Sequence, residues 1–331
     1  MTHLRTTACL LGWLALAPPL GSHAVDSLVT YRVVPSDTDA AITRFNDPHV
    51  VIFSPQIAPS ADLLIFMPGT GGNPASVSDF LNVAASQGYR VISLAYNDTP
   101  AVVEVCQQDP DPDCSAKVRQ KRIFGDNTTT RINDTKAESI VNRLVQLIAA
   151  LDRTHPSEGW GQYLDGGAPN WSRIAVSGHS QGAGMAAYIA QKERVARVIL
   201  FSSPWDFYGR NQELAPWVHE GPGATPPDLW FGAYHRKENT AALIAQAYKA
   251  LKIPEAHVRV FTLEPSRKIG ANPYHLSMVG NGTTPRDAAG APAYASEWRF
   301  LVGSSRESLV MNARPSAASP MTRAGSRASL P

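Results

Sequence analysis

The apolar positions of this chain follow two different periods, and the periods alternate along the sequence. The run Asp-Leu-Leu-Ile-Phe-Met at 62–67 is typical of a strand buried on both faces of a sheet. Residues 76–86 then repeat their apolar side chains at helical spacing, and YRVISLAY at 89–96 returns to a strand pattern. Strand, helix and strand in this order form the unit of a parallel sheet.

The same alternation continues to the end of the ordered part of the chain. It predicts a doubly wound, mostly parallel α/β domain over 25–303. Further strands are expected at 28–34, 49–53, 173–176, 195–201, 229–234 and 258–263, and further helices from an N-cap at Asp134, after Ser180 to about 192, at 239–251 and at 292–302.

Both periods disappear between residues 97 and 133, where the chain is polar and contains proline and two cysteines. This segment is interpreted as an insertion over one end of the sheet. Cys106 and Cys114 lie close together in CQQDPDPDC. In an exported protein two such cysteines are expected to form a disulfide that holds a surface loop.

The first 24 residues have the pattern of a secretory signal peptide. Arg5 precedes an apolar run at 8–16, and small residues around Ala24 offer a cleavage position. The alternative is an ordinary buried N-terminal helix. A signal peptide predicts that the protein is secreted or periplasmic, and residues 304–331, rich in Ser, Arg, Ala and Pro, are expected to form a disordered tail.

Composition excludes several classes of partner. The 331 residues are 44% hydrophobic and carry a formal net charge of +2 without charge blocks, so neither nucleic acid nor a polyacidic partner is expected. No stretch after the signal is long and apolar enough for a membrane span. No metal site is expected, and no heptad gives a reason to predict more than a monomer.

Small residues surround one serine in RIAVSGHSQGAGMAAYIA, residues 173–190. Gly178-His-Ser180-Gln-Gly182 matches G-x-S-x-G between a predicted strand and a predicted helix. A sharp turn there exposes the serine hydroxyl, and glycines two residues on either side avoid collisions with the neighbouring strand and helix. The helix N-terminus also favours negative charge. The pattern predicts that Ser180 is a nucleophile rather than part of a structural turn.

With these residues the chain resembles the α/β-hydrolases, particularly serine esterases and lipases, over roughly residues 31–302. Gly-His-Ser-Gln-Gly, with Pro-Trp after the next strand, is similar to the cutinase-like and polyester-hydrolase branch. The resemblance implies a chain order of serine, acid, histidine and no cofactor. Among the nine histidines, His275 alone lies beyond the last predicted strand, and His235 is the competitor.

Two carboxylates remain open as the acid that the resemblance implies. Glu238 follows the strand at 229–234, the commoner location in this family, whereas Asp206 follows the preceding strand. Position favours Glu238, and the more usual residue type favours Asp206; we expect Glu238.

The resemblance also implies an oxyanion hole built from two loops. One backbone N–H would come from Gln181, directly after the serine, and the other from Thr70 in the glycine-rich loop MPGTGGNP at 67–74. Trp205 is expected either beside the substrate acyl group or in the core.

The expected reaction is hydrolysis of a small or polymeric carboxylic ester through an acyl-enzyme. The insertion at 97–133 argues against a polymer, because it could roof the pocket. An amidase or peptidase with the same triad and a non-catalytic binding protein of this fold remain as alternatives.

Overall fold

A sheet of eight strands forms the centre of the computed structural model, which describes residues 28–58, 60–209 and 213–304. The predicted signal peptide and all but the first residue of the predicted tail lie outside these ranges. The strand order is β1-β2-β4-β3-β7-β8-β11-β12. The strands are β1 (Val29–Val33), β2 (His49–Phe53), β3 (Leu63–Met67), β4 (Arg90–Ser93), β7 (Ile174–His179), β8 (Arg197–Phe201), β11 (Trp230–His235) and β12 (Val258–Phe261).

The sheet is antiparallel at one edge and parallel elsewhere. β2 pairs antiparallel with β1 and β4, and the remaining neighbours pair in parallel. Parallel neighbours need crossover connections, and helices between the strands provide them. This topology, with a sharp turn from β7 into a helix, is the α/β-hydrolase fold that the sequence predicts.

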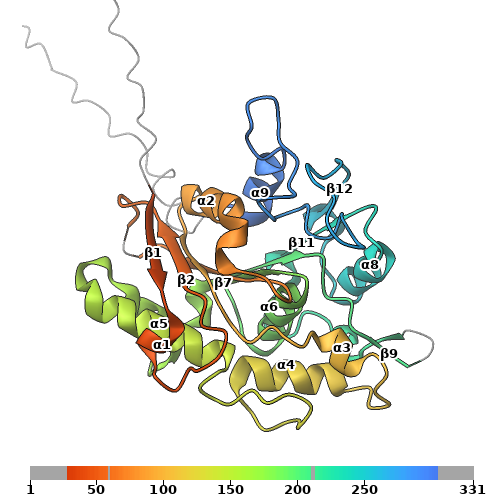
Figure 1. The fold of residues 1–331 in the computed structure, drawn as a ribbon, viewed down its shortest axis with the longest axis horizontal. Helices are drawn as coiled ribbons and strands as arrows, with labels where there is room; N and C mark the ends of the chain where they lie inside the picture. The colour runs from red at the N-terminus through yellow and green to blue at the C-terminus, as the bar shows by residue number, and fades with distance from the viewer. Residues whose placement is uncertain (1–27, 59, 210–212, 305–331) are drawn as a thin grey trace, which may run out of the picture.

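Helices cover both faces of the sheet (Figure 1). One face packs against α2 (Ser78–Ser86) and α9 (Ala295–Val302). The other packs against the larger helical layer, which consists of α4 (Cys114–Phe124), α5 (Ile140–Thr154), α6 (Gln181–Lys192) and α8 (Ala241–Ala250). Short elements complete the described chain: α1 (Pro35–Thr38), α3 (Val102–Cys106), α7 (Pro216–His219) and the two-stranded pairs β5 (Leu164–Asp165) with β6 (Ala168–Pro169) and β9 (Phe207–Tyr208) with β10 (Glu213–Leu214).

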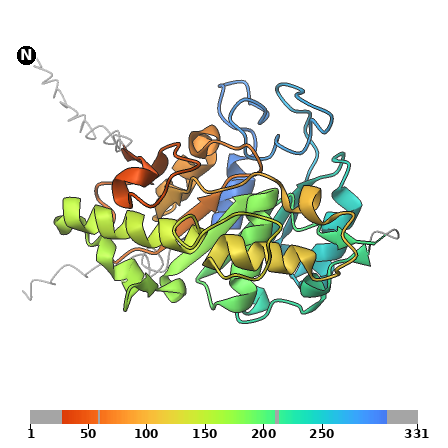
Figure 2. The ribbon, with the colours of Figure 1, turned by 60° about the horizontal axis from the view of Figure 1, so that its bottom comes forward.

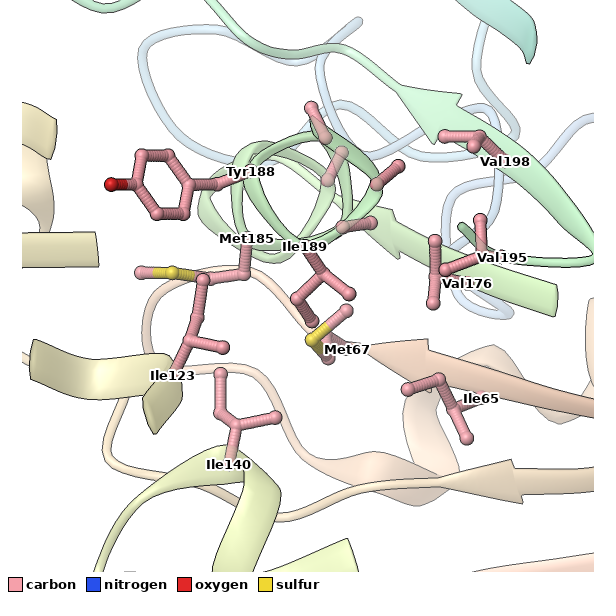
Figure 3. Packing of buried hydrophobic residues seen from close by; sticks show 14 of the residues in the cluster. Ile65, Met67, Ile123, Ile140, Val176, Met185, Tyr188, Ile189, Val195 and Val198 are labelled. Carbon is pink, nitrogen blue, oxygen red and sulfur yellow. The ribbon is translucent and has the colours of Figure 1, made fainter. Parts of the chain in front are cut away.

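The central strands are apolar throughout because successive side chains enter different cores. Ile65 and Met67 of β3 face the larger helical layer, whereas Phe66 faces α2 and α9. In the larger layer, Ile123 of α4 and Ile140 of α5 converge with residues of α6 on these strands (Figure 3). β7 is packed in the same way, because Val176 faces the larger helical layer and Ala175 faces α2 and α9. Ser180, the nucleophile candidate, therefore follows a strand that is packed on both faces.

The segment 97–133, in which no helix or strand was predicted, contains α3 and α4. α4 lies alongside α5 and α6 (Figure 2) and buries Val118 and Ile123 together with Arg119 and Arg122. Two arginines on the buried face hid the helical period in the sequence.

The predicted N-cap at Asp134 is wrong. The helix begins at Ile140, and Oγ of Ser139 accepts a hydrogen bond from the backbone N–H of Asn142 at 3.2 Å. Asp134 instead forms a buried ion pair with Arg122, with Oδ2 3.0 Å from Nε. The carboxylate is thus used by the insertion and not by the helix start.

The disulfide between Cys106 and Cys114 is present, but its surroundings differ from the predicted surface loop. It joins the last residue of α3 to the first residue of α4, and both cysteines are buried. The bond therefore ties two helices of the insertion together. None of the helices in the described ranges is both long and apolar enough to cross a bilayer.

Candidate active site

The turn at Ser180 has the strained geometry that its glycines permit. Ser180 has φ 54° and ψ −124°, and its backbone N–H donates to the carbonyl of Phe201 in β8 at 2.8 Å. A Cβ on Gly178 would lie 2.4 Å from the carbonyl carbon of Gly182, and a Cβ on Gly182 would lie 2.0 Å from the carbonyl oxygen of Met67. Both positions therefore exclude a side chain, and Ser180 is forced to the tip of the turn.

His275 pairs with Glu238. Its Nδ1 lies 2.8 Å from Oε2 of Glu238, whose side chain is fully buried. The ring of His275 also lies 4.7 Å, between centroids, from the ring of His179, the residue before Ser180. The loop after β12 thus brings His275 to the turn that carries the serine.

The second oxygen of Glu238 is held by two further donors. Oε1 accepts from the hydroxyl of Ser202 at 2.9 Å and from the backbone N–H of His235 at 2.7 Å. Three hydrogen bonds fix the carboxylate in one orientation in a buried place. The remaining oxygen is thereby directed at the imidazole.

The other carboxylate considered from the sequence has a different partner. Both oxygens of Asp206 bind Arg119 of α4, at 2.6 Å from Nη2 and 2.7 Å from Nε. The indole N–H of Trp217 donates to Asp206 at 3.0 Å. Within the described chain Asp206 therefore belongs to a buried ion pair.

His235, the competing histidine, lies fully buried and is used by its own surroundings. Its Nδ1 accepts from the backbone N–H of Lys237 at 3.0 Å, and its Nε2 lies 3.0 Å from the carbonyl oxygen of Leu263. These contacts hold the loop after β11, which carries Glu238.

The glycine-rich loop after β3 approaches the serine closely. A Cβ on Gly69 would lie 3.0 Å from Cβ of Ser180. The carboxylate of Asp98 accepts hydrogen bonds from the backbone N–H groups of Gly71 and Gly72, and the Tyr96 hydroxyl donates to the carbonyl of Pro68 at 2.7 Å. Burial raises the pKa of Asp98, and its hydrogen bonds oppose this shift. Asp98 and Tyr96 thus fix the position of the loop that contains Thr70.

The side chain of Gln181 joins the turn to the insertion. Its Oε1 accepts from the backbone N–H of Val102 at 2.7 Å and from Nη1 of Arg122 at 3.1 Å, and its Nε2 donates to the carbonyl of Asp98. Asp98 therefore contacts both segments from which oxyanion N–H groups are expected.

The pKa of His179 is lowered to about 3, chiefly by burial and also by the neighbouring His275, while a hydrogen bond to the His275 carbonyl opposes the shift. Nε2 of His179 lies 2.8 Å from that carbonyl oxygen. His179 is therefore neutral at neutral pH and supports the backbone of His275 as a donor.

A cavity of about 170 Å³ opens beside Ser180. Its lining includes four residues singled out from the sequence, Thr70, Gln181, Trp205 and Asp206. Residues of α3 and Arg119 of α4 also belong to the described lining. A larger depression, about 420 Å³, lies between β1 and α5, away from the turn. In the described ranges no group of three or more His, Cys, Asp or Glu side chains is arranged to hold a metal ion.

No protein-family model and no curated protein matches this sequence. Solved structures of similar fold include Thermogutta terrifontis esterase 2 phosphorylated by paraoxon, 13% identical, with a TM-score of 0.43 and coverage of 86% of this chain and 94% of that chain. TT1662 from Thermus thermophilus is also 13% identical, with a TM-score of 0.39 and coverage of 72% and 89%. Likeness of this extent does not indicate what this chain acts on.

Four residues at the site were not singled out as functional from the sequence. They are Asp98, Arg119, Ser202 and His179. Ser202 has φ 57°, close to the φ 54° of Ser180, so a serine with positive φ follows β8 as well as β7. Neither the Ser-Ser-Pro-Trp-Asp run nor the polar insertion carries a motif that marks these contacts.

Proposed function

We propose that this protein is a serine hydrolase that cleaves carboxylic esters. The observation that carries the proposal is the hydrogen bond between His275 and the buried Glu238, made beside the strained turn of Ser180. A nucleophile on such a turn, a histidine next to it and a carboxylate that orients the histidine are the three parts that acyl transfer needs.

In the proposed reaction Ser180 Oγ attacks the ester carbonyl while Nε2 of His275 takes the hydroxyl proton. Nδ1–H of His275 donates to Glu238, which fixes the tautomer and stabilises the imidazolium as it forms. The imidazolium then gives the proton to the leaving alcohol, and the acyl group remains on Ser180. Water, deprotonated by the same histidine, releases the acid in the second step.

The backbone N–H groups of Thr70 and Gln181 are assigned to the oxyanion. Thr70 lies in the loop whose next two N–H groups Asp98 holds, and Gln181 begins α6, whose dipole favours negative charge at that end. Donors fixed before the reaction stabilise the tetrahedral intermediate without reorganising.

We propose further that the protein is exported. The signal pattern of residues 1–24 supports this, and so does the disulfide, since such bonds persist in oxidising compartments.

The test combines turnover with labelling of the serine. We expect the purified protein to hydrolyse p-nitrophenyl butanoate and to gain one fluorophosphonate adduct on the peptide containing Ser180. Ser180→Ala should lose both, with an unchanged circular dichroism spectrum. Faster cleavage of the matched p-nitroanilide would instead identify an amidase, and a protein that is neither labelled nor active would be a binding protein.

A further inference from the structure

We propose that the cavity beside Ser180 restricts the substrate to esters of short, uncharged acyl groups, and that α3 sets the upper length. This inference rests on the proposed function, because it assumes that the acyl group on Ser180 enters this cavity. It assigns a role in substrate specificity to α3, which lies in the insertion and contains none of the proposed catalytic residues.

The size of the cavity gives the first limit. Its volume is about 170 Å³, and Ser180 is part of its lining. An apolar protein cavity of about 150 Å³ holds one benzene molecule, which has about six heavy atoms. The acyl group, counted with its carbonyl, should therefore fit from acetyl to about pentanoyl.

The wall formed by α3 is fixed at both ends. At its start, the backbone N–H of Val102 donates to Gln181 of the serine turn at 2.7 Å. At its end, Cys106 is joined by the disulfide to α4. Val103 and Trp205 line the cavity and are half-buried, so their side chains border the space that a longer acyl chain would need. A wall tied in this way cannot move aside as a free loop would.

The charges around the cavity give the second limit. Among the described residues of the lining, Arg119 is the one cation, and Asp206 already binds it through two hydrogen bonds. Arg119 also points Nη1 at the carbonyl of Gln181, 3.4 Å away. Glu104, which is exposed, adds a negative charge to the lining. An acyl group that ends in a carboxylate would therefore meet repulsion from the described part of the lining, whose one cation is already paired.

The experiment measures kcat/KM for p-nitrophenyl acetate, butanoate, hexanoate, octanoate and dodecanoate, with p-nitrophenyl hemisuccinate beside the butanoate. We expect the highest value between acetate and butanoate, and at least a tenfold fall by octanoate. The hemisuccinate should be at least tenfold poorer than the butanoate. A profile that is flat or rises to dodecanoate would overturn the length limit, and equal rates for hemisuccinate and butanoate would overturn the charge limit.

Variants of α3 and of Trp205, which lies in the loop after β8, test the role of the side chains that line the cavity. Val103→Ala and Trp205→Ala should each move the preferred acyl length upward, so that the octanoate-to-butanoate ratio of kcat/KM rises at least fivefold. Val105→Ala is the matched control, because Val105 lies on the same helix and packs against the core rather than the cavity. Its ratio should equal that of the parent. An equal shift in Val103→Ala and Val105→Ala would mean that loosening α3, and not the size of the cavity, changes the preference.

The failure of this inference is distinct from that of the proposed function. Absence of both hydrolysis and fluorophosphonate labelling overturns the proposed function and this inference with it. Hydrolysis that depends on Ser180 but ignores acyl length overturns the inference alone.

Discussion

The loops after β8 and β11 each place a buried carboxylate near the serine, yet the two carboxylates have different partners. Glu238, after β11, binds His275, the backbone N–H of His235 and the hydroxyl of Ser202, which directly follows β8. Asp206, after β8, binds Arg119, which α4 brings from the insertion. The two loops are alike in their place on the sheet and differ in which distant segment reaches them.

This difference indicates that position at a strand end is not sufficient to make a carboxylate the orienting acid. A buried carboxylate needs hydrogen-bond donors or a counter-charge, and the partner that binds it determines its role. Arg119 binds both oxygens of Asp206, and Asp206 is part of the cavity wall. Glu238 is the carboxylate that contacts His275.

The largest expected effect separates the two carboxylates. Glu238→Gln should lower kcat/KM on the order of 10²–10⁴-fold, because the amide no longer fixes the tautomer of His275. Asp206→Asn should lower activity much less but reduce the free energy of unfolding by about 3–5 kcal/mol, because it leaves Arg119 buried without its counter-charge. Ester hydrolysis and urea denaturation of both variants measure these changes.

Arg119→Met combined with Asp206→Leu provides the control for the ion pair. Replacing both charges by apolar side chains should recover most of the stability that Asp206→Asn loses. If Asp206→Asn lost more activity than Glu238→Gln while remaining folded, the acid would have to be moved to the loop after β8.

A smaller effect is expected when the insertion that supplies Arg119 is loosened. Cys106→Ser with Cys114→Ser should lower the free energy of unfolding by roughly 2–3 kcal/mol, since the bond closes a short loop of separation 8. The fluorophosphonate should still label Ser180, because the turn does not depend on the disulfide. Dithiothreitol should lower the urea midpoint of the parent to that of the double variant and leave the variant unchanged; a parent insensitive to reduction would contradict this.

The last effect depends on pH and concerns two buried histidines, which leave stability at neutral pH unchanged. The pKa of His49 and that of His179 are both lowered to about 3, chiefly by burial. Below the unfolded-state pKa of about 6.5 the unfolded chain binds more protons than the native one. Stability from these histidines is therefore complete above pH 6.5 and is lost as pH falls toward 3, at about 1.4 kcal/mol per pH unit for each histidine.

Urea unfolding between pH 7.5 and 5 measures this slope. Nδ1 of His49 accepts from the backbone N–H of Ala95 at 2.9 Å, a bond that requires an unprotonated nitrogen. His49→Gln should thus remove one proton from the pH dependence while keeping an acceptor at that place. An unchanged slope in this variant would show that His49 does not contribute.

The turn at Ser180 was predictable because its causes are local. Gly178 and Gly182 are needed because a Cβ at either position would collide with neighbouring backbone atoms. The five-residue pattern G-x-S-x-G between apolar runs therefore indicates the turn. The succession of strands and helices along the chain was predictable for a related reason, since each strand and helix buries its own period of apolar residues.

The insertion was not predictable from the same signals. α4 turns Arg119 and Arg122 inward, where Arg119 pairs with Asp206, which is 87 residues away in sequence, and Arg122 pairs with Asp134. A hydrophobic period cannot reveal a helix whose buried face is partly charged, and so no helix was predicted in this segment.

The sequence by itself therefore determined the succession of strands and helices along the chain, the strained serine and a short set of candidates for its partners. The tertiary structure decided that His275 meets Glu238, that Asp206 meets Arg119 and that α3 borders the cavity. Backbone sterics and apolar periodicity act between near neighbours, so residue type and spacing are enough to predict them. Pairing of buried charges depends on which segments the finished fold brings within about 3 Å, and that distance is set by the packing of the whole domain.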